Sequence, residues 1–322
     1  MSAASTSVGD GDEDYEMDLR QGVASGGGGG GGADAAAGND VSAGLLDTMP
    51  LLISVDQALK GRRRRPCDDE FGRALEEMRH RVLGTPLVPP WPTTCRRALF
   101  AAGCFWGLEK GFWRLPGVHS TATGYAGGFT PHPSYSEVAS GLTGHAEAVL
   151  VVYDPARIAY TDLLRWYWQC HDPTQGMGQG ADCGTQYRSL IACTDEAQHT
   201  LARASRDAYQ RAIASCGRSF TACRQITAEI VRWRNEQKEG ELPFFYYAEE
   251  AHMQHFARPS AFSACCNAQP LRIELPPYET WDVAAEDENE ENAPRLPEAF
   301  WAKHAPAVRC ALTRPNEPIV CY

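Results

Sequence analysis

One cysteine stands between two glycines and in front of two aromatic residues, in the run Gly103-Cys104-Phe105-Trp106-Gly107. The apolar residues from Arg96 to Ala102 predict a buried strand, and apolar residues at helical spacing predict a helix from Phe105 to Leu115. Cys104 would then lie at the helix N-terminus, where unpaired N–H groups and the helix dipole favour an anion. We therefore expect the thiol pKa to fall below about 8.5 and the thiolate to act as a nucleophile. The alternative is a buried structural cysteine.

Five short motifs follow one another between residues 103 and 189. They read GCFWGLE at 103–109, TGYAGG at 123–128, GHAE at 144–147, HDPT at 171–174 and GTQYRS at 184–189. In this order they resemble the A-type peptide methionine sulfoxide reductases, over roughly residues 99–253, and the resemblance is weak or absent at both ends of the chain. The resemblance implies an α+β fold: a two-layer sandwich with a ferredoxin-like plait, a mixed sheet, long loops and an irregular C-terminal coil.

Reduction of a sulfoxide needs a nucleophile at sulfur, an acid that protonates the oxygen, and donors aimed at that oxygen. Glu147 opens an otherwise apolar predicted strand, so burial should raise its carboxyl pKa above about 4.3 and keep it protonated. The alternative is a strand-end carboxylate that faces water. The resemblance implies that Glu147 is the acid, that the hydroxyls of Tyr135 and Tyr187 bind the oxygen, and that Asp182 organises water.

The methyl group of the substrate needs an apolar pocket. The resemblance implies that Phe105 and Trp106 form it, and contacts of sulfur and methyl groups with aromatic rings are favourable by about 0.3 to 1.5 kcal/mol. Core packing is the alternative for both residues. Cys183, beside Asp182, is expected to fill space rather than to react.

Attack by Cys104 leaves a sulfenic acid, so repeated turnover needs a second thiol and an external reductant. The last residues, PIVCY at 318–322, resemble the ending of plant-like members of the family, in which a cysteine on a mobile tail reaches the site. This implies Cys321 as the resolving cysteine, with Cys265, Cys266 and Cys310 as alternatives. The resemblance also implies thioredoxin, or a dithiol, as the reductant, no bound metal or organic cofactor, and methionine-S-sulfoxide, free or in proteins, as the substrate.

The remaining elements must position these side chains. Apolar content predicts strands, helical spacing and capping residues predict helices, and clusters of Gly, Pro, Ser and Thr predict loops. We expect loops at 117–144 and 176–184, strands at 147–153, 187–193 and 221–231, and helices after a Thr161-Asp162 cap, from an Asp195 cap to Ser215, and over 249–256.

Charge is unevenly distributed along the chain. The first sixty residues carry ten acidic and two basic residues, a net charge of 2 − 10 = −8, and a seven-glycine run. Such a segment cannot bury enough apolar surface to fold. We therefore expect a largely disordered acidic, glycine-rich extension at 1–90, a catalytic domain at 91–262, and an irregular C-terminal tail at 263–322 that carries the candidate resolving cysteines.

The same composition limits the partners of the chain. Residues 96–260 carry 16 basic and 16 acidic residues, so no basic face indicates nucleic acid. The basic run at 60–65 is expected to be a solvated linker; a weak nuclear address and a contact for an acidic partner are the alternatives. No apolar stretch approaches the ~18 residues of a membrane span, and no secretory or typical transit signal is evident. We expect a monomer in the cytoplasm.

Two other classes of function stay open. The chain could capture oxidised methionine, or sense peroxide through Cys104, without repeated turnover. A metal-binding interaction protein is a third possibility, but none of the twelve cysteines forms a Cys-x-x-Cys pair, the spacing typical of structural zinc.

Overall fold

The computed structural model describes residues 51–62, 75–217, 224–233, 243–259, 268–283, 292–306 and 314–320. All of them belong to the unit that runs from Leu45 to Tyr322. Residues 1–50 and four of the cysteines singled out above lie outside the described residues: Cys265, Cys266, Cys310 and Cys321. Within the described residues, no helix combines the length and the apolar character needed to cross a bilayer.

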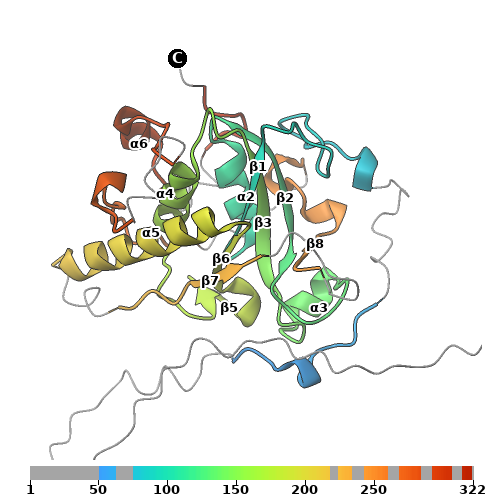
Figure 1. The fold of residues 1–322 in the computed structure, drawn as a ribbon. Coiled ribbons are helices and arrows are strands. Elements are labelled where there is room, and N and C mark those ends of the chain that lie inside the picture. The colour runs from blue at the N-terminus through green and yellow to red at the C-terminus, as the bar shows by residue number, and fades with distance from the viewer. Residues whose placement is uncertain are drawn as a thin grey trace, which may run out of the picture. The chain divides into compact units, whose positions relative to one another are not determined.

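A βαββαβ succession forms the centre of the fold (Figure 1). The strand order at its centre is β6-β1-β3-β2, with every neighbouring pair antiparallel, which is the order of a ferredoxin-like plait. A parallel strand beside β6 and an antiparallel strand beside β2 extend it to a mixed six-stranded sheet, so the expected fold class is confirmed. The elements are β1 (Arg96–Ala102), α2 (Phe105–Trp113), β2 (Val118–Ala126), β3 (Ala146–Tyr153), α4 (Tyr160–Cys170), β6 (Ser189–Cys193), β7 (Glu229–Arg232) and β8 (Phe245–Tyr247).

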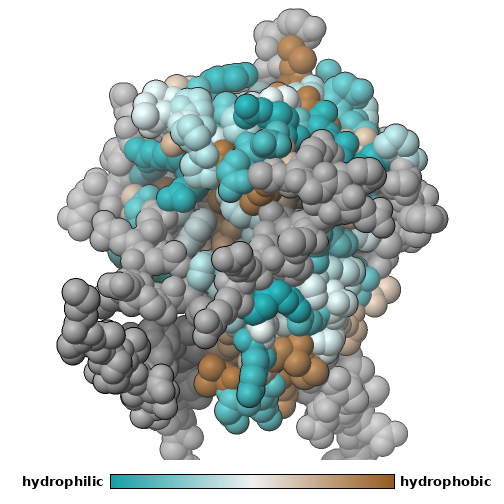
Figure 2. Space-filling view, turned by 90° about the vertical axis from the view of Figure 1, so that its right-hand side faces the viewer, coloured by the Kyte–Doolittle hydropathy of each residue, from teal (hydrophilic) through white to brown (hydrophobic). Residues whose placement is uncertain are grey.

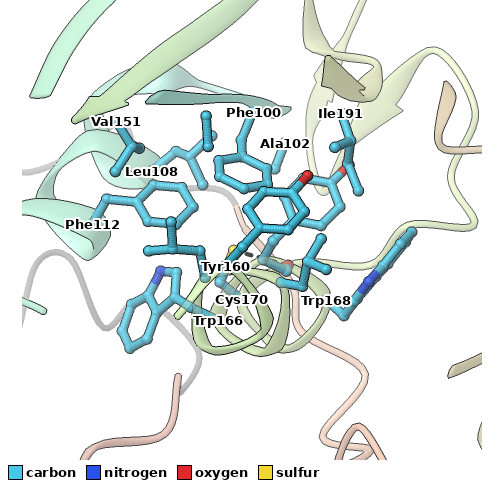
Figure 3. Packing of buried hydrophobic residues seen from close by; sticks show 14 of the residues in the cluster. Phe100, Ala102, Leu108, Phe112, Val151, Tyr160, Trp166, Trp168, Cys170 and Ile191 are labelled. Carbon is cyan, nitrogen blue, oxygen red and sulfur yellow. Dashed lines mark hydrogen bonds between the residues drawn. The ribbon is translucent and has the colours of Figure 1, made fainter. Parts of the chain in front are cut away.

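Strand β1 is apolar from Ala98 onward because both of its faces are buried there. Ala98, Phe100 and Ala102 point into the main core, where α2 and α4 cover the sheet, whereas Leu99 and Ala101 belong to a smaller core on the other face. In the main core, Phe100 stacks on Phe112 of α2 with ring centroids 4.9 Å apart (Figure 3). Alternate residues of one strand therefore hold two layers together.

The helix α5 (Glu196–Ser215) begins where its capping residue predicts. The Gln198 amide donates to the Asp195 carboxylate at 2.8 Å, and Gly217 follows the helix in the left-handed conformation. Helix α4 begins one residue before the expected cap. Asp162 lies in its first turn and accepts a hydrogen bond from the Ala159 amide at 3.0 Å, so its carboxylate caps the helix from inside.

The loop expected at 117–144 contains regular structure that composition conceals. Strand β2 lies between β3 and β8, and a Cβ atom at Gly124 would stand 2.3 Å from the Tyr246 carbonyl oxygen. Glycine is needed there because the two backbones approach so closely. A short helix, α3 (Tyr135–Ala139), follows. The loop expected at 176–184 contains the hairpin of β4 (Gly178–Gln179) and β5 (Asp182–Cys183).

The prediction of a helix over 249–256 is wrong. Two 3₁₀ turns, Glu250–His252 and His255–Ala257, take its place, and Gln254 between them has a positive φ of 46°. The backbone amide and the side-chain amide of Gln254 each donate to the buried carboxylate of Glu109, at 2.7 Å. This tertiary contact holds a left-handed residue that breaks the helix. Strand β7 covers residues 229–232 and is shorter than the strand expected at 221–231. Residues 221–223 of that expected strand lie outside the described residues.

Packed structure extends on both sides of the domain expected at 91–262. Met78 and Leu87 are buried on the N-terminal side. On the C-terminal side, largely irregular coil contains the helix α6 (Glu298–His304), whose Phe300 and Trp301 are buried in the main core. Buried residues are therefore present on both sides of 91–262.

Gly111 makes the crossing of α2 and α4 possible, and we predict that Gly111→Ala destabilises the protein. A Cβ atom at this position would lie 2.6 Å from Nε1 of the buried Trp166. Helix propensity favours alanine by about 1 kcal/mol, whereas overpacking costs about 1 to 3 kcal/mol. Urea unfolding should show a net loss in the free energy of unfolding. The loss should shrink in a Trp166→Phe background, and a gain in stability would contradict this account.

Candidate active site

Cys104 lies at the junction of β1 and α2, as the residue that precedes the first turn of the helix. It is partly exposed. Gly103 reaches this junction with a φ of 83°, and a Cβ atom there would stand 2.7 Å from Cβ of Gln179. Only glycine combines this backbone conformation with this close approach. The thiol is thus carried on a sharp turn at the N-terminal end of α2.

Glu147 lies beside this turn because of the strand register. Strands β1 and β3 are antiparallel with Phe100 opposite Val149, so the end of β1 meets the start of β3. The Glu147 carboxylate accepts a hydrogen bond from the Phe105 amide at 3.0 Å, one residue after Cys104. Its side chain is buried, and the alternative of a water-facing carboxylate is therefore wrong.

The environment of Glu147 makes it an acid at neutral pH. Burial raises its pKa to about 8, against the lowering effect of the Phe105 hydrogen bond, and the negative charge of Asp182 raises it further. A carboxyl group with this pKa still holds its proton at pH 7 and can donate it. The burial and the raised pKa expected from its position in the sequence are both present.

The two tyrosines and Asp182 converge on the same place from separate elements. Tyr135 is the first residue of α3, Tyr187 ends a 3₁₀ turn, and Asp182 lies on β5; all three are partly buried. Burial raises the pKa of the Tyr187 phenol, and charges on Glu147, Tyr135, Asp182 and Cys104 raise it further. Tyr187 therefore stays protonated, and the five groups share one electrostatic neighbourhood.

An aromatic wall borders this neighbourhood. Phe105 is buried and Trp106 is partly exposed. The Tyr135 ring stacks on His252 with centroids 4.2 Å apart, and the Trp106 indole N–H donates to Nδ1 of His252 at 3.2 Å. The His255 ring also stacks on the Trp106 ring, with centroids 3.8 Å apart. The Phe105 ring packs against the rings of Trp106 and Tyr135, with centroids 6.4 Å apart in both pairs.

Two residues of the site are missing from the sequence-based predictions, His252 and Glu249. The Glu249 carboxylate accepts hydrogen bonds from the Tyr135 amide at 2.7 Å and from the Tyr125 hydroxyl at 2.6 Å. It thereby fixes the start of α3 against β2. The available signal was the concentration of Tyr, Glu and His between 246 and 255, in a segment that the helix pattern obscured.

The other cysteines stand in different environments. Cys183 is exposed on β5, so the expectation that it fills space is wrong. Cys321 and its three alternatives lie outside the described residues. The described chain nearest to Cys321 is anchored at the far end of α2, where the Ile319 amide donates to the Arg114 carbonyl at 2.8 Å. Among the described residues, no group of three or more His, Cys, Asp or Glu side chains could hold a metal ion.

Comparisons with known proteins identify the family of this chain. Residues 96–275 match the family model described as peptide methionine sulfoxide reductase. Peptide methionine sulfoxide reductase MsrA of Salinispora arenicola is 49% identical over 226 residues, 70% of this chain and 92% of that protein. MsrA 2 of a Nostoc species is 54% identical over 179 residues, 56% of this chain and 74% of that protein.

A solved structure shows the same relationship. Methionine sulfoxide reductase A of Corynebacterium diphtheriae aligns with a TM-score of 0.54 at 34% identity, over 68% of this chain and 100% of that one. The alignment spans the whole of that protein, and the matched family model includes Cys104, Glu147 and both tyrosines. This chain belongs to the peptide methionine sulfoxide reductase family.

Proposed function

We propose that this chain reduces methionine-S-sulfoxide, free or within proteins, to methionine, with Cys104 as the nucleophile. One observation supports this most directly. A partly exposed thiol precedes a helix whose first amide donates to a buried carboxyl group with a pKa of about 8. A protonated acid is thus hydrogen-bonded to the residue that follows the nucleophile, and sulfoxide reduction requires both groups.

The chemical step transfers oxygen from the substrate to the enzyme. The Cys104 thiolate forms a bond to the sulfoxide sulfur while Glu147 gives its proton to the sulfoxide oxygen. The bond between the two sulfur atoms and the sulfur–oxygen bond of the substrate then break as the hydroxyl group passes to the Cys104 sulfur, and methionine leaves as the thioether. Cysteine is oxidised by two electrons to a sulfenic acid, and the sulfoxide is reduced by two electrons to the thioether.

The surrounding groups stabilise this step. The hydroxyls of Tyr135 and Tyr187 donate to the oxygen, and the raised pKa of Tyr187 keeps its proton in place. Asp182 organises water and, through its charge, raises the pKa of Glu147. Phe105 and Trp106 hold the methyl group.

Recycling needs a second thiol. A resolving cysteine attacks the sulfenic acid, a disulfide forms and water leaves; thioredoxin then reduces the disulfide. Cys321 is the proposed resolving residue. Helix α2 separates Cys104 from the Ile319 anchor by about 15 Å, and two residues span at most about 7 Å. The contact between Ile319 and Arg114 must therefore open before Cys321 can reach Cys104.

We predict that Cys104→Ser abolishes the first turnover. The serine hydroxyl is a much weaker nucleophile than a thiolate, and it does not ionise to the alkoxide at neutral pH. The reduced protein is mixed with methionine sulfoxide without a reductant, and released methionine is quantified by mass spectrometry. Cys183→Ser is the matched control, since it removes an exposed thiol from the rim of the same site. Methionine release by Cys104→Ser would reject the assignment.

The resolving thiol is identified by mass mapping of the disulfide that forms after substrate is added. We expect a Cys104–Cys321 linkage in the wild-type chain. Cys321→Ser should keep the first turnover and lose steady-state turnover with thioredoxin. A linkage to Cys265, Cys266 or Cys310 would show that an alternative thiol is used, and a chain without recycling would be a sensor rather than a reductase.

The rate of the first turnover should fall as pH rises through about 8, because Glu147 then loses the proton that it donates. Asp182→Asn removes a negative charge that raises the pKa of Glu147, so the midpoint of this fall should move to lower pH. Glu147→Gln should lose the pH dependence together with a factor of about 10² to 10⁴ in rate. Rapid-quench measurements from pH 6 to 10 test this. Asp207→Asn, on the exposed face of α5, is the control. An unchanged midpoint in Asp182→Asn would contradict the assigned coupling.

A further inference from the structure

Arg62, the first residue of the arginine run, is not part of a solvated linker. Its guanidinium makes a two-pronged ion pair with Glu137 of α3, with both N–O distances 2.7 Å. The same group donates to the His132 carbonyl at 2.9 Å. The expectation for the run is therefore wrong at Arg62, while Arg63, Arg64 and Arg65 lie outside the described residues.

Residues 51–62, here called the strap, follow the segment that carries Tyr135. The Leu59 amide donates to the Leu142 carbonyl at 2.9 Å, and the Leu59 carbonyl accepts from the Thr130 hydroxyl at 2.8 Å. The Arg62 amide donates to the Pro131 carbonyl at 3.1 Å. The strap thus contacts the segment 130–142 before and after α3, although some 70 residues separate them in the chain.

Polar contacts hold the strap more than apolar burial does. Leu51 and Val55 are 87% and 67% exposed, and Leu142 beside the strap is 44% exposed. Apolar surface is visible near the bottom of the molecule in Figure 2, and the strap (blue in Figure 1) also lies near the bottom. Because these side chains gain little from burial, the Arg62 fork provides a large share of the attachment.

Glu137 links the fork to the start of α3. Its carboxylate also accepts hydrogen bonds from the amide and the hydroxyl of Ser134, at 2.8 and 3.0 Å, and so caps the helix. A helix of five residues is too short to be stable by itself. Arg62 from outside and Glu249 from inside therefore decide where Tyr135, its first residue, is held.

We propose that Arg62 is a positioning residue for Tyr135, and that the strap keeps α3 in the conformation that binds the sulfoxide. This inference rests on the proposed function. Release of the strap lowers the fraction of molecules in which Tyr135 is correctly placed. Apparent affinity falls in proportion to that fraction, whereas the chemical step in correctly assembled complexes is unchanged.

The test compares first-turnover kinetics of the full chain with Arg62→Ala and Arg62→Lys. For Arg62→Ala we expect the half-saturating sulfoxide concentration to rise about fivefold, with the maximal rate within about twofold of wild type. Arg62→Lys keeps the positive charge but cannot form the two-pronged ion pair, so its half-saturating concentration should lie between those of wild type and Arg62→Ala. Arg165→Ala is the matched control: it removes a similar fork, to Glu298 of α6, at the opposite end of the molecule from α3 (Figure 1).

Hydrogen exchange of residues 133–140 provides a readout independent of turnover. Exchange should be faster in Arg62→Ala and unchanged in Arg165→Ala. An unaltered exchange rate, or a loss in maximal rate at constant half-saturation, would overturn the inference. If the wild-type chain releases no methionine, the proposed function fails, and the exchange experiment still decides whether the strap holds α3.

Discussion

The hydrogen bond from the Phe105 amide to the Glu147 carboxyl group is the interaction on which the site depends. It joins the first turn of α2 to the start of β3 and places a buried acid beside the residue that carries the thiol. The burial that gives Glu147 its raised pKa comes from the same packing that forms the core. Fold and chemistry therefore share one contact, and neither the acid nor the nucleophile can shift alone.

Backbone geometry leaves little freedom around this contact. The register of β1 against β3 brings the end of one strand to the start of the other. Gly103 then turns the chain into α2 against Gln179, where a side chain would collide. Strand pairing and one left-handed glycine thus set the position of Cys104 at the start of α2, beside the aromatic residues Phe105 and Trp106.

The segments outside the family model act on the site from two ends of α2. The strap contacts the segment that carries Tyr135, near the N-terminal end, whereas Ile319 contacts Arg114 at the C-terminal end. The proposed cycle requires opposite behaviour of the two contacts. The strap must stay in place to hold Tyr135, whereas the C-terminal anchor must open if Cys321 is to resolve the sulfenic acid. The two contacts differ in kind: a charged fork holds the first. The second consists of the backbone hydrogen bond from Ile319 to Arg114, a hydrogen bond from the Trp113 indole to the Asn316 carbonyl, and the buried Ile319 side chain.

Local patterns in the sequence determined the strand–turn–helix around Cys104, the buried start of β3 at Glu147 and the cap of α5 at Asp195. Each depends on residues within a few positions of one another, so periodicity and capping chemistry suffice to predict it. Tertiary structure decided the rest. The glycine and threonines of β2 suggest a loop until the close approach of β8 is known. Gln254 breaks an expected helix because Glu109, far away in sequence, holds it. Glu249, His252 and Arg62 reach the site from 114, 146 and 75 residues away along the chain, counted to Tyr135, Trp106 and Glu137. Contacts over such separations form only when the chain folds. A local sequence pattern therefore cannot predict which distant backbone group or ring a side chain will contact.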